Sequence, residues 1–292
     1  MDELVRVSHG LWRAETDVTD LRGLCAAVLD VMPPGTVLAG RTAAALHALW
    51  LPGSETPWVD LILSRPGMLP RTLAHSQRTE VRARRRTLRE SEKTLVAGLP
   101  TVTPERAWID LAEELSLPDL VACGDSVLRG CTGPAVGLDV VVGTATGRRG
   151  VRRAREAVTL LDARSRSRPE SHLRVALVTG GLPVPEVNQP IFDEHHQWLA
   201  EPDLHYEVPR VALEYQGAMH AQLERMHRDI TRGIDVVGND WLSVPFGPAE
   251  VFKRPWAIAP LVRALIDRRA PGWLREWRET HRVARNIAPL AG

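Results

Sequence analysis

Two carboxylates, Asp203 and Glu214, lie in the segment EPDLHYEVPRVALEYQG, which covers residues 201–217. Glu214 interrupts the apolar run VALEY, and a carboxylate in a buried strand is costly unless a partner or a metal ion compensates for its charge. Two carboxylates and one backbone carbonyl, that of Tyr215, are hard oxygen donors of the kind that Mg²⁺ or Mn²⁺ prefers. We therefore expect Asp203, Glu214 and Tyr215 to bind one divalent cation, which would activate water and stabilise charge during phosphodiester hydrolysis.

Gln216 and His220 complete the predicted catalytic set with Asp203 and Glu214. Gln216 follows Glu214 by two positions, so in a strand both side chains point to the same face of the sheet. We expect Gln216 to orient the attacking water. His220 follows the strand, where it would assist proton transfer as a base or a water-orienting group. The alternative for His220, a solvent-facing residue at a helix start, stays open.

Glu170, Asp229 and Arg232 are accessory candidates. Glu170 lies in the first turn of a predicted helix, where it either complements the helix dipole or has an accessory or second-metal role. Asp229 and Arg232 are three positions apart on another predicted helix. They either form a surface pair or contribute to the site.

The elements that must position these residues follow from the hydrophobic periodicity of residues 169–269. The pattern predicts a helix over 169–183, strands over 184–193, 196–206 and 209–217, a helix over 220–240, a strand over 241–246 and helices over 248–269. A hairpin of the second and third strands would bring Asp203 to Glu214. A helix between the third and fourth strands requires a crossover, and hence a mixed sheet with helices against it.

The first half of the chain predicts smaller elements in an α+β arrangement. Helices are expected over 21–31, 36–52 with Thr42 as N-cap, 117–130 and 148–163, and strands over 57–67 and 79–88. Residues 99–115 predict a strand and then a helix that begins at Thr103-Pro104-Glu105, which is a cap, a first-turn proline and an early acidic residue. Several small helices beside a short sheet are similar to a winged-helix arrangement.

The bulk composition is that of an ordinary globular protein, with 44% hydrophobic and 25% charged residues in 292 positions. This length accommodates two domains, and the polar, Arg-rich segment 162–171 predicts their boundary, giving domains over 1–163 and 164–292. No apolar run approaches the roughly 20 residues that span a bilayer. The three cysteines lack paired metal spacing, and the N-terminus has no signal-peptide pattern. We expect a cytoplasmic protein with no membrane partner.

Arginines are concentrated in residues 81–90, 147–155 and 163–169, although the net charge is only +1. Guanidinium groups bind phosphate backbones through bidentate contacts, so these clusters favour a nucleic-acid partner. The alternative, a solvated surface balanced by acidic neighbours, stays open. The residues expected to contact nucleic acid are Arg82, Arg84, Arg86, Arg148, Arg149, Arg152 and Arg153.

The motifs PESHLR, EPD and LEYQG together resemble the PD-(D/E)XK nuclease superfamily over roughly residues 168–255. The tail from LEYQGAMH to WLSVPF resembles its very-short-patch-repair endonuclease branch. The positions that match the branch are Glu214, Tyr215, Gly217, His220, Asp229, Arg232 and Asn239-Asp240-Trp241. The resemblance implies a restriction-endonuclease-like core, a Mg²⁺ or Mn²⁺ cofactor and a DNA substrate. Gln216 departs from the superfamily's frequent lysine. In its place, His220, His227, Arg228 and Arg232 are local candidates for a basic group.

The N-terminal region resembles the AbiEi-type antitoxin domains of actinobacterial proteins, through VLAGRTAAALHALWLP (37–52) and the segment 101–130. Those domains are similar to winged-helix DNA binders. Gly40-Arg41 replaces the usual Ser-His, and Ala48 replaces the usual Gly. The resemblance therefore supports the architecture more than any base-specific contact, and His47 is expected to be a structural helix residue.

Two functions follow as hypotheses. The first is a divalent-metal-dependent DNA endonuclease whose N-terminal region binds DNA or a partner. The second is a non-catalytic DNA-binding transcriptional regulator or antitoxin-like protein that retains a nuclease fold. RNA in place of DNA, a homodimer, and a toxin or antitoxin partner all remain open. The chain lacks a phosphate-loop glycine pattern, which argues against an ATP-driven role.

Overall fold

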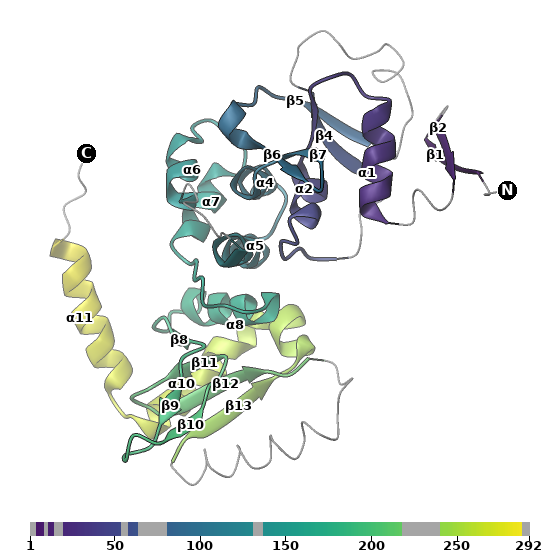
Figure 1. Cartoon of the computed structure of the whole chain (residues 1–292). Helices are drawn as coiled ribbons and strands as arrows, with labels where there is room; N and C mark the ends of the chain where they lie inside the picture. Colours follow the sequence, from purple (N-terminus) through teal and green to yellow (C-terminus); the bar gives the residue numbers. More distant parts are fainter. Residues whose placement is uncertain are drawn as a thin grey trace. The chain divides into compact units, whose positions relative to one another are not determined.

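A computed structural model shows that the chain has an α+β fold with mixed sheets (Figure 1). The structure describes residues 4–8, 11–14, 20–53, 58–63, 81–130, 137–217 and 240–287. The chain divides into two compact units, Met1–Leu161 and Asp162–Gly292. The division lies two residues before the boundary expected from the sequence. In the described part of the chain, no helix has the length and hydrophobicity that a membrane crossing requires.

The first unit contains a mixed sheet in the order β5–β4–β3–β7–β6. Its strands are β3 (Thr36–Leu38), β4 (Val59–Leu63), β5 (Val81–Arg85), β6 (Lys93–Val96) and β7 (Leu99–Val102). The pairs β4–β5 and β3–β7 are parallel, whereas β3–β4 and β6–β7 are antiparallel. A separate hairpin is formed by β1 (Leu4–Ser8) and β2 (Leu11–Ala14).

Helices complete the core of this unit. They are α1 (Leu21–Asp30), α2 (Gly40–Leu46), the short helix η2 (Glu90–Glu92), α4 (Pro104–Leu111), α5 (Leu117–Gly130), α6 (Leu138–Thr144) and α7 (Val151–Val158). Cys25 and Val28 of α1 pack with Leu38 and Leu61 of the sheet. Thr103 caps α4 as predicted, because its side chain accepts a 3.3 Å hydrogen bond from the N–H of Arg106.

The predicted helix over 36–52 is wrong in its first part. Residues 36–38 form β3, and α2 begins only at Gly40. Thr42 is not an N-cap but lies inside α2, where its hydroxyl accepts a 2.9 Å bond from the N–H of Asp60. Because β3 pairs with β4 on one side and β7 on the other, tertiary pairing outweighs the local helical pattern. The helix predicted over 148–163 is shorter in the structure, because α7 begins only after Gly150, whose φ is 78°.

The second unit contains the sheet that carries the predicted site, in the order β13–β12–β11–β8. Its strands are β8 (Glu186–Val187), β11 (Leu204–Tyr206), β12 (Val211–Tyr215) and β13 (Leu242–Phe246). Strand β12 is parallel to β13 and antiparallel to β11. A parallel pair needs a crossover connection, so the predicted mixed sheet is confirmed. The predicted helix over 220–240 lies almost entirely outside the described residues.

The two faces of this sheet are covered differently (Figure 1). One face packs against α8 (Arg168–Thr179) and α10 (Ile258–Arg269), with Leu177, Leu213 and Val262 fully buried between them. On the other face, Ala212 packs with the small hairpin of β9 (Ile191–Phe192) and β10 (Trp198–Ala200). The remaining elements are the π-helical turn η3 (Ala249–Lys253), the short helix η4 (Pro255–Ala257) and α11 (Trp273–Ile287).

Two predicted strands are each broken into two. The segment 184–193 divides into β8 and β9, and the segment 196–206 divides into β10 and β11. Asn188 adopts a φ of 47° at the first break, a backbone conformation that an asparagine tolerates better than most residues. Its N–H donates a 3.0 Å bond to the carbonyl of Asp203, at the second break. One backbone hydrogen bond therefore connects the two breaks.

Candidate active site

Asp203 and Glu214 are brought together at the end of the β11–β12 hairpin. Leu204 pairs with Leu213, so the register places Asp203 across from Glu214. Leu204 and Leu213 both face the core beneath α8 and α10. Because side chains alternate along a strand, Glu214 points to the opposite face, the one that carries Ala212. The hairpin expected from the sequence therefore provides two carboxylates at one edge of the sheet.

The carboxyl group of Asp203 lies in an environment that disfavours its charge. Burial raises the pKa of Asp203 to about 6, and the nearby charges of Glu170 and Glu214 act in the same direction. A 2.8 Å hydrogen bond from the N–H of Tyr215 and the positive charge of Arg166 oppose the increase in pKa. Asp203 is thus a carboxylate that another positive charge, such as that of a divalent cation, would stabilise.

Glu170 is held at the start of α8 by a set of hydrogen bonds. Ser167, the N-cap, donates to Glu170 Oε1 at 2.7 Å, and the N–H of Arg166 donates to Oε2 at 2.8 Å. Asn188 Nδ2 also donates to Oε2 at 2.8 Å, while its backbone N–H binds the carbonyl of Asp203. These bonds fix Glu170 in the first turn of α8, behind the N-cap Ser167, and Asn188 connects it to Asp203. Both predicted roles of Glu170, the helix-dipole role and the accessory or second-metal role, stay predictions.

Tyr215 and Gln216 extend the site along β12. The N–H and C=O of one strand residue point to the same side of the strand, so the Tyr215 carbonyl points toward the side of Asp203, like its N–H. The N–H of Gln216 points the other way and donates a 2.8 Å bond to the carbonyl of Phe246. Gln216 is exposed, and strand alternation places its side chain on the same face as that of Glu214.

Two contributors to the site were not predicted individually. Arg166 forms an ion pair with Glu201 and lowers the pKa of Asp203, whereas the sequence showed it only as one member of an arginine cluster. Asn188 is buried and bridges Glu170 and Asp203. The signal that could have identified it is the dipeptide Gln-Pro after an asparagine, which is typical of a turn rather than a continuous strand.

The other predicted site residues, His220, Asp229 and Arg232, lie outside the described residues, as do His227 and Arg228. Within the described ranges, no group of three or more His, Cys, Asp or Glu side chains could hold a metal ion. The predicted donor set has two carboxylates and a backbone carbonyl.

Most of the arginines expected to bind nucleic acid make contacts within the first unit. Arg82 pairs with Asp60 and Glu114, Arg84 and Arg86 approach Glu113 at 3.7 and 3.8 Å, Arg148 pairs with Asp110 at 2.8 Å, and Arg153 donates to the carbonyls of Ala112 and Leu115. Arg149 and Arg152 differ, since both are exposed and form no ion pair with any residue that the structure describes. That these seven residues bind nucleic acid stays a prediction.

Comparison with known proteins identifies relatives over nearly the whole chain. No family model matches. Two curated proteins of Mycobacterium tuberculosis, "Uncharacterized protein MT2308" (strain CDC 1551 / Oshkosh) and "Uncharacterized protein Rv2248" (strain ATCC 25618 / H37Rv), are each 31% identical over 271 residues, covering 91% of this chain and 93% of their own. The crystal structure of the RV2827C protein from Mycobacterium tuberculosis is similar at 22% identity over 53% of this chain and 60% of its own, with a TM-score of 0.37. Because the curated relatives match at this identity over most of both chains, the protein belongs to the same family as these two uncharacterized mycobacterial proteins.

Proposed function

We propose that the chain is a divalent-metal-dependent DNA endonuclease that hydrolyses phosphodiester bonds. The observation that carries the proposal is that Asp203 lies across from Glu214, where β11 begins and β12 ends. The pKa of Asp203 is raised by burial and by its acidic neighbours. Two like charges in one partly dry site oppose each other's ionisation. A bound cation would offset this electrostatic repulsion between the two carboxylates.

The residues present fit a Mg²⁺ or Mn²⁺ ion by the chemistry of their donors. One oxygen of Asp203 receives the N–H of Tyr215, which leaves the second oxygen for a cation. Glu214 and the carbonyl of Tyr215 would supply further hard oxygen ligands. When bound, such an ion lowers the pKa of water and stabilises negative charge on a phosphodiester.

The chain's own residues would have separate tasks. Asp203 and Glu214 would hold the ion, and the exposed amide of Gln216 would orient the attacking water through hydrogen bonds. Arg166 lies close enough to lower the pKa of Asp203, so it favours the ionised form that a metal requires. Proton transfer by His220 remains part of the proposal on sequence grounds alone.

The first unit would bind DNA, with contacts to the phosphate backbone from its arginines. The AbiEi-like pattern of residues 37–52 supports this part of the proposal. DNA is favoured over RNA by the resemblance of the second unit to mismatch endonucleases. A cytoplasmic location is expected with this substrate.

A plasmid-nicking assay tests the catalytic assignment. Wild-type protein should nick supercoiled DNA with Mg²⁺ or Mn²⁺ and lose this activity in EDTA. The variants Asp203→Asn and Glu214→Gln, which keep side-chain shape, should lose at least about 100-fold in rate, because metal-ion stabilisation contributes several kcal/mol. Glu194→Gln is the matched control, because the Glu194 side chain is 82% exposed. Equal rates in all four proteins would refute the assignment.

The second candidate is a DNA-binding regulator that retains the nuclease fold without turnover. It is favoured by the neutral, exposed Gln216 at the position where the superfamily frequently has a lysine. This candidate predicts salt-sensitive DNA binding with no cleavage in any metal. Calorimetry with Mn²⁺ separates the two, since only the endonuclease requires metal binding that depends on Asp203 and Glu214.

A further inference from the structure

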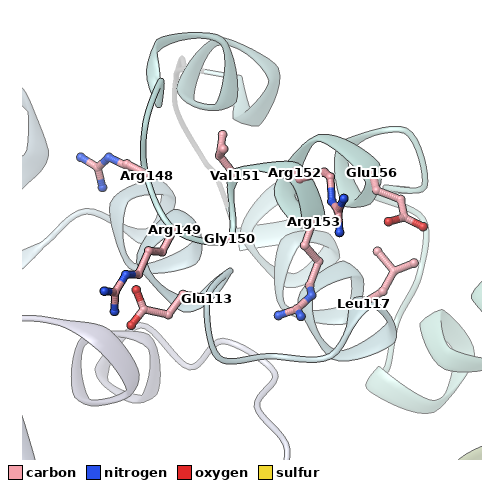
Figure 2. A pocket seen from close by; sticks show the side chains of 9 residues that line it. All are labelled: Glu113, Leu117, Arg148, Arg149, Gly150, Val151, Arg152, Arg153 and Glu156. Carbon is pink, nitrogen blue, oxygen red and sulfur yellow. The ribbon is translucent and has the colours of Figure 1, made fainter.

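A cavity of about 590 Å³ in the first unit lies where α7 begins, and its lining is rich in arginine (Figure 2). The lining residues are Glu113, Leu117, residues 148–153 and Glu156. Figure 2 shows side chains of Arg148, Arg149, Arg152 and Arg153 distributed around one turn of the chain and the start of α7. Small-molecule pockets are predominantly apolar, whereas charged side chains dominate this lining.

The lining has four arginines and two glutamates, Glu113 and Glu156, so its formal charge is positive. Glu113 already has two cationic neighbours, Arg84 and Arg86, at 3.7 and 3.8 Å. Arg149 and Arg152 form no ion pair within the described part of the chain, and both are exposed. The surface of the cavity therefore presents guanidinium groups whose hydrogen-bond donors are open to an anion.

The backbone that carries Arg149 and Arg152 is anchored on both sides. Arg148, directly before Arg149, pairs with Asp110 at 2.8 Å. Arg153, directly after Arg152, donates to the carbonyls of Ala112 at 3.0 Å and of Leu115 at 2.6 Å. The two exposed arginines are thus carried by a segment that is already ordered, which reduces the entropy cost of binding.

Gly150 allows this segment to lie directly on the end of α4. Its φ is 78°, and a Cβ at this position would be 2.4 Å from backbone atoms of Ala112 and Glu113. No side chain fits such an approach. The close contact fixes the chain between Arg149 and Arg152 against the end of α4.

We propose that Arg149 and Arg152 bind phosphate groups of a DNA backbone at this cavity, whereas Arg148 and Arg153 hold the binding segment in place. The inference rests on the DNA-binding part of the proposed function and is independent of its nuclease chemistry. It divides one arginine cluster into two residues that contact the ligand and two that position them. Bidentate guanidinium–phosphate contacts are the chemistry that recognises the ligand.

The salt dependence of DNA binding tests the inference. Binding of a short fluorescein-labelled duplex is measured by anisotropy at several salt concentrations in EDTA, which excludes cleavage. Each lost phosphate contact reduces the slope of log K against log salt by about 0.9, so Arg149→Gln with Arg152→Gln should reduce it by about 1.8. Arg155→Gln is the matched control, because it removes one exposed charge from the same helix outside the cavity and should leave the slope unchanged.

Several outcomes would overturn the inference. The first is an equal slope in the wild type and the double variant, and the second is an equal loss in the Arg155→Gln control. Absence of duplex binding by the wild type also overturns it. The inference is also overturned if calorimetry shows that the wild type binds inorganic phosphate and the double variant does not, while the salt slope for DNA is the same in both. The cavity would then bind a small anion rather than DNA. Unchanged thermal midpoints establish that the variants are folded. Failure of the nuclease proposal is distinct, because it appears as the expected slopes without any nicking by the wild type.

Discussion

The carboxylate of Asp203 accepts a 2.8 Å hydrogen bond from the backbone N–H of Tyr215, the residue that follows Glu214. This bond occupies one oxygen of Asp203 at the point where the β11–β12 ladder ends. It holds the carboxyl group against the neighbouring strand, although burial and two acidic neighbours oppose its charge. The stability of the second unit should therefore depend on the charge of Asp203.

In the absence of metal, stability should fall as Asp203 ionises. The folded-state pKa of about 6 lies above the ordinary value of 3.8, so the folded state binds the proton more tightly than the unfolded state. This contribution is complete below the ordinary value and is lost as pH rises through about 6, with an upper limit of about 3 kcal/mol. Urea unfolding in EDTA should show wild type losing stability relative to Asp203→Asn over this range. A constant difference at all pH values would contradict the assignment, and Glu194→Gln should behave as wild type.

A divalent metal ion should restore, at neutral pH, the stability that is lost when Asp203 ionises. A ligand that binds only the folded state at about 100 times its Kd stabilises it by about 2.7 kcal/mol, which corresponds to an increase of about 5 °C or more in thermal midpoint. The increase with Mn²⁺ should be present in the wild type and in Glu194→Gln, and small in Asp203→Asn and in Glu214→Gln. Equal shifts in all four proteins, measured by scanning fluorimetry, would place the metal elsewhere.

Asn188 should be more important to stability than its position between two short strands suggests. The variant Asn188→Gly keeps the positive φ accessible but removes the donor to Glu170, at an expected cost of about 1–3 kcal/mol. Asn188→Asp should cost more at neutral pH, because it places a second carboxylate against Glu170 Oε2. Urea unfolding at pH 7 compares the two variants, and the reverse order would contradict the role assigned to this contact.

Gly150→Ala should destabilise the first unit far more than Gly147→Ala. Both glycines have positive φ, 78° and 74°, but a Cβ on Gly150 would clash with the backbone of Ala112, whereas one on Gly147 meets nothing within 4 Å. The Gly147 variant therefore measures the conformational penalty alone, about 1–2 kcal/mol. Calorimetric unfolding of the full chain should show a distinctly larger loss for Gly150→Ala, and similar losses would mean that the turn relaxes at little cost.

The starts of α4 and α8 were predictable because their signals are local. Thr103-Pro104-Glu105 places a cap, a first-turn proline and an acidic residue in consecutive positions, and α4 begins there. Pro169 and Glu170 correctly indicated the start of α8. Residues 36–38 could not be assigned in this way, since their strand exists only because β4 and β7 lie on either side.

For the candidate site, strand alternation and the hairpin of β11 with β12 were enough to place Asp203 near Glu214. The connection from Glu170 through Asn188 could not be predicted, because it joins residues 18 positions apart through a hydrogen bond between side chains. The hydrogen bond that anchors Arg148 to Asp110 joins residues 38 positions apart. The sequence of the arginine cluster therefore could not show which of its arginines are anchored and which are exposed.

The sequence by itself determined where α4 and α8 begin and that a carboxylate occupies an apolar strand, since capping chemistry and hydrophobic alternation act over a few neighbouring residues. Only the tertiary structure decided that Glu170 is fixed in the first turn of α8 while its charge acts on Asp203, and that Arg149 and Arg152 stay exposed while Arg148 and Arg153 are anchored. The physical reason is that burial and charge pairing depend on which distant residues meet when the chain folds.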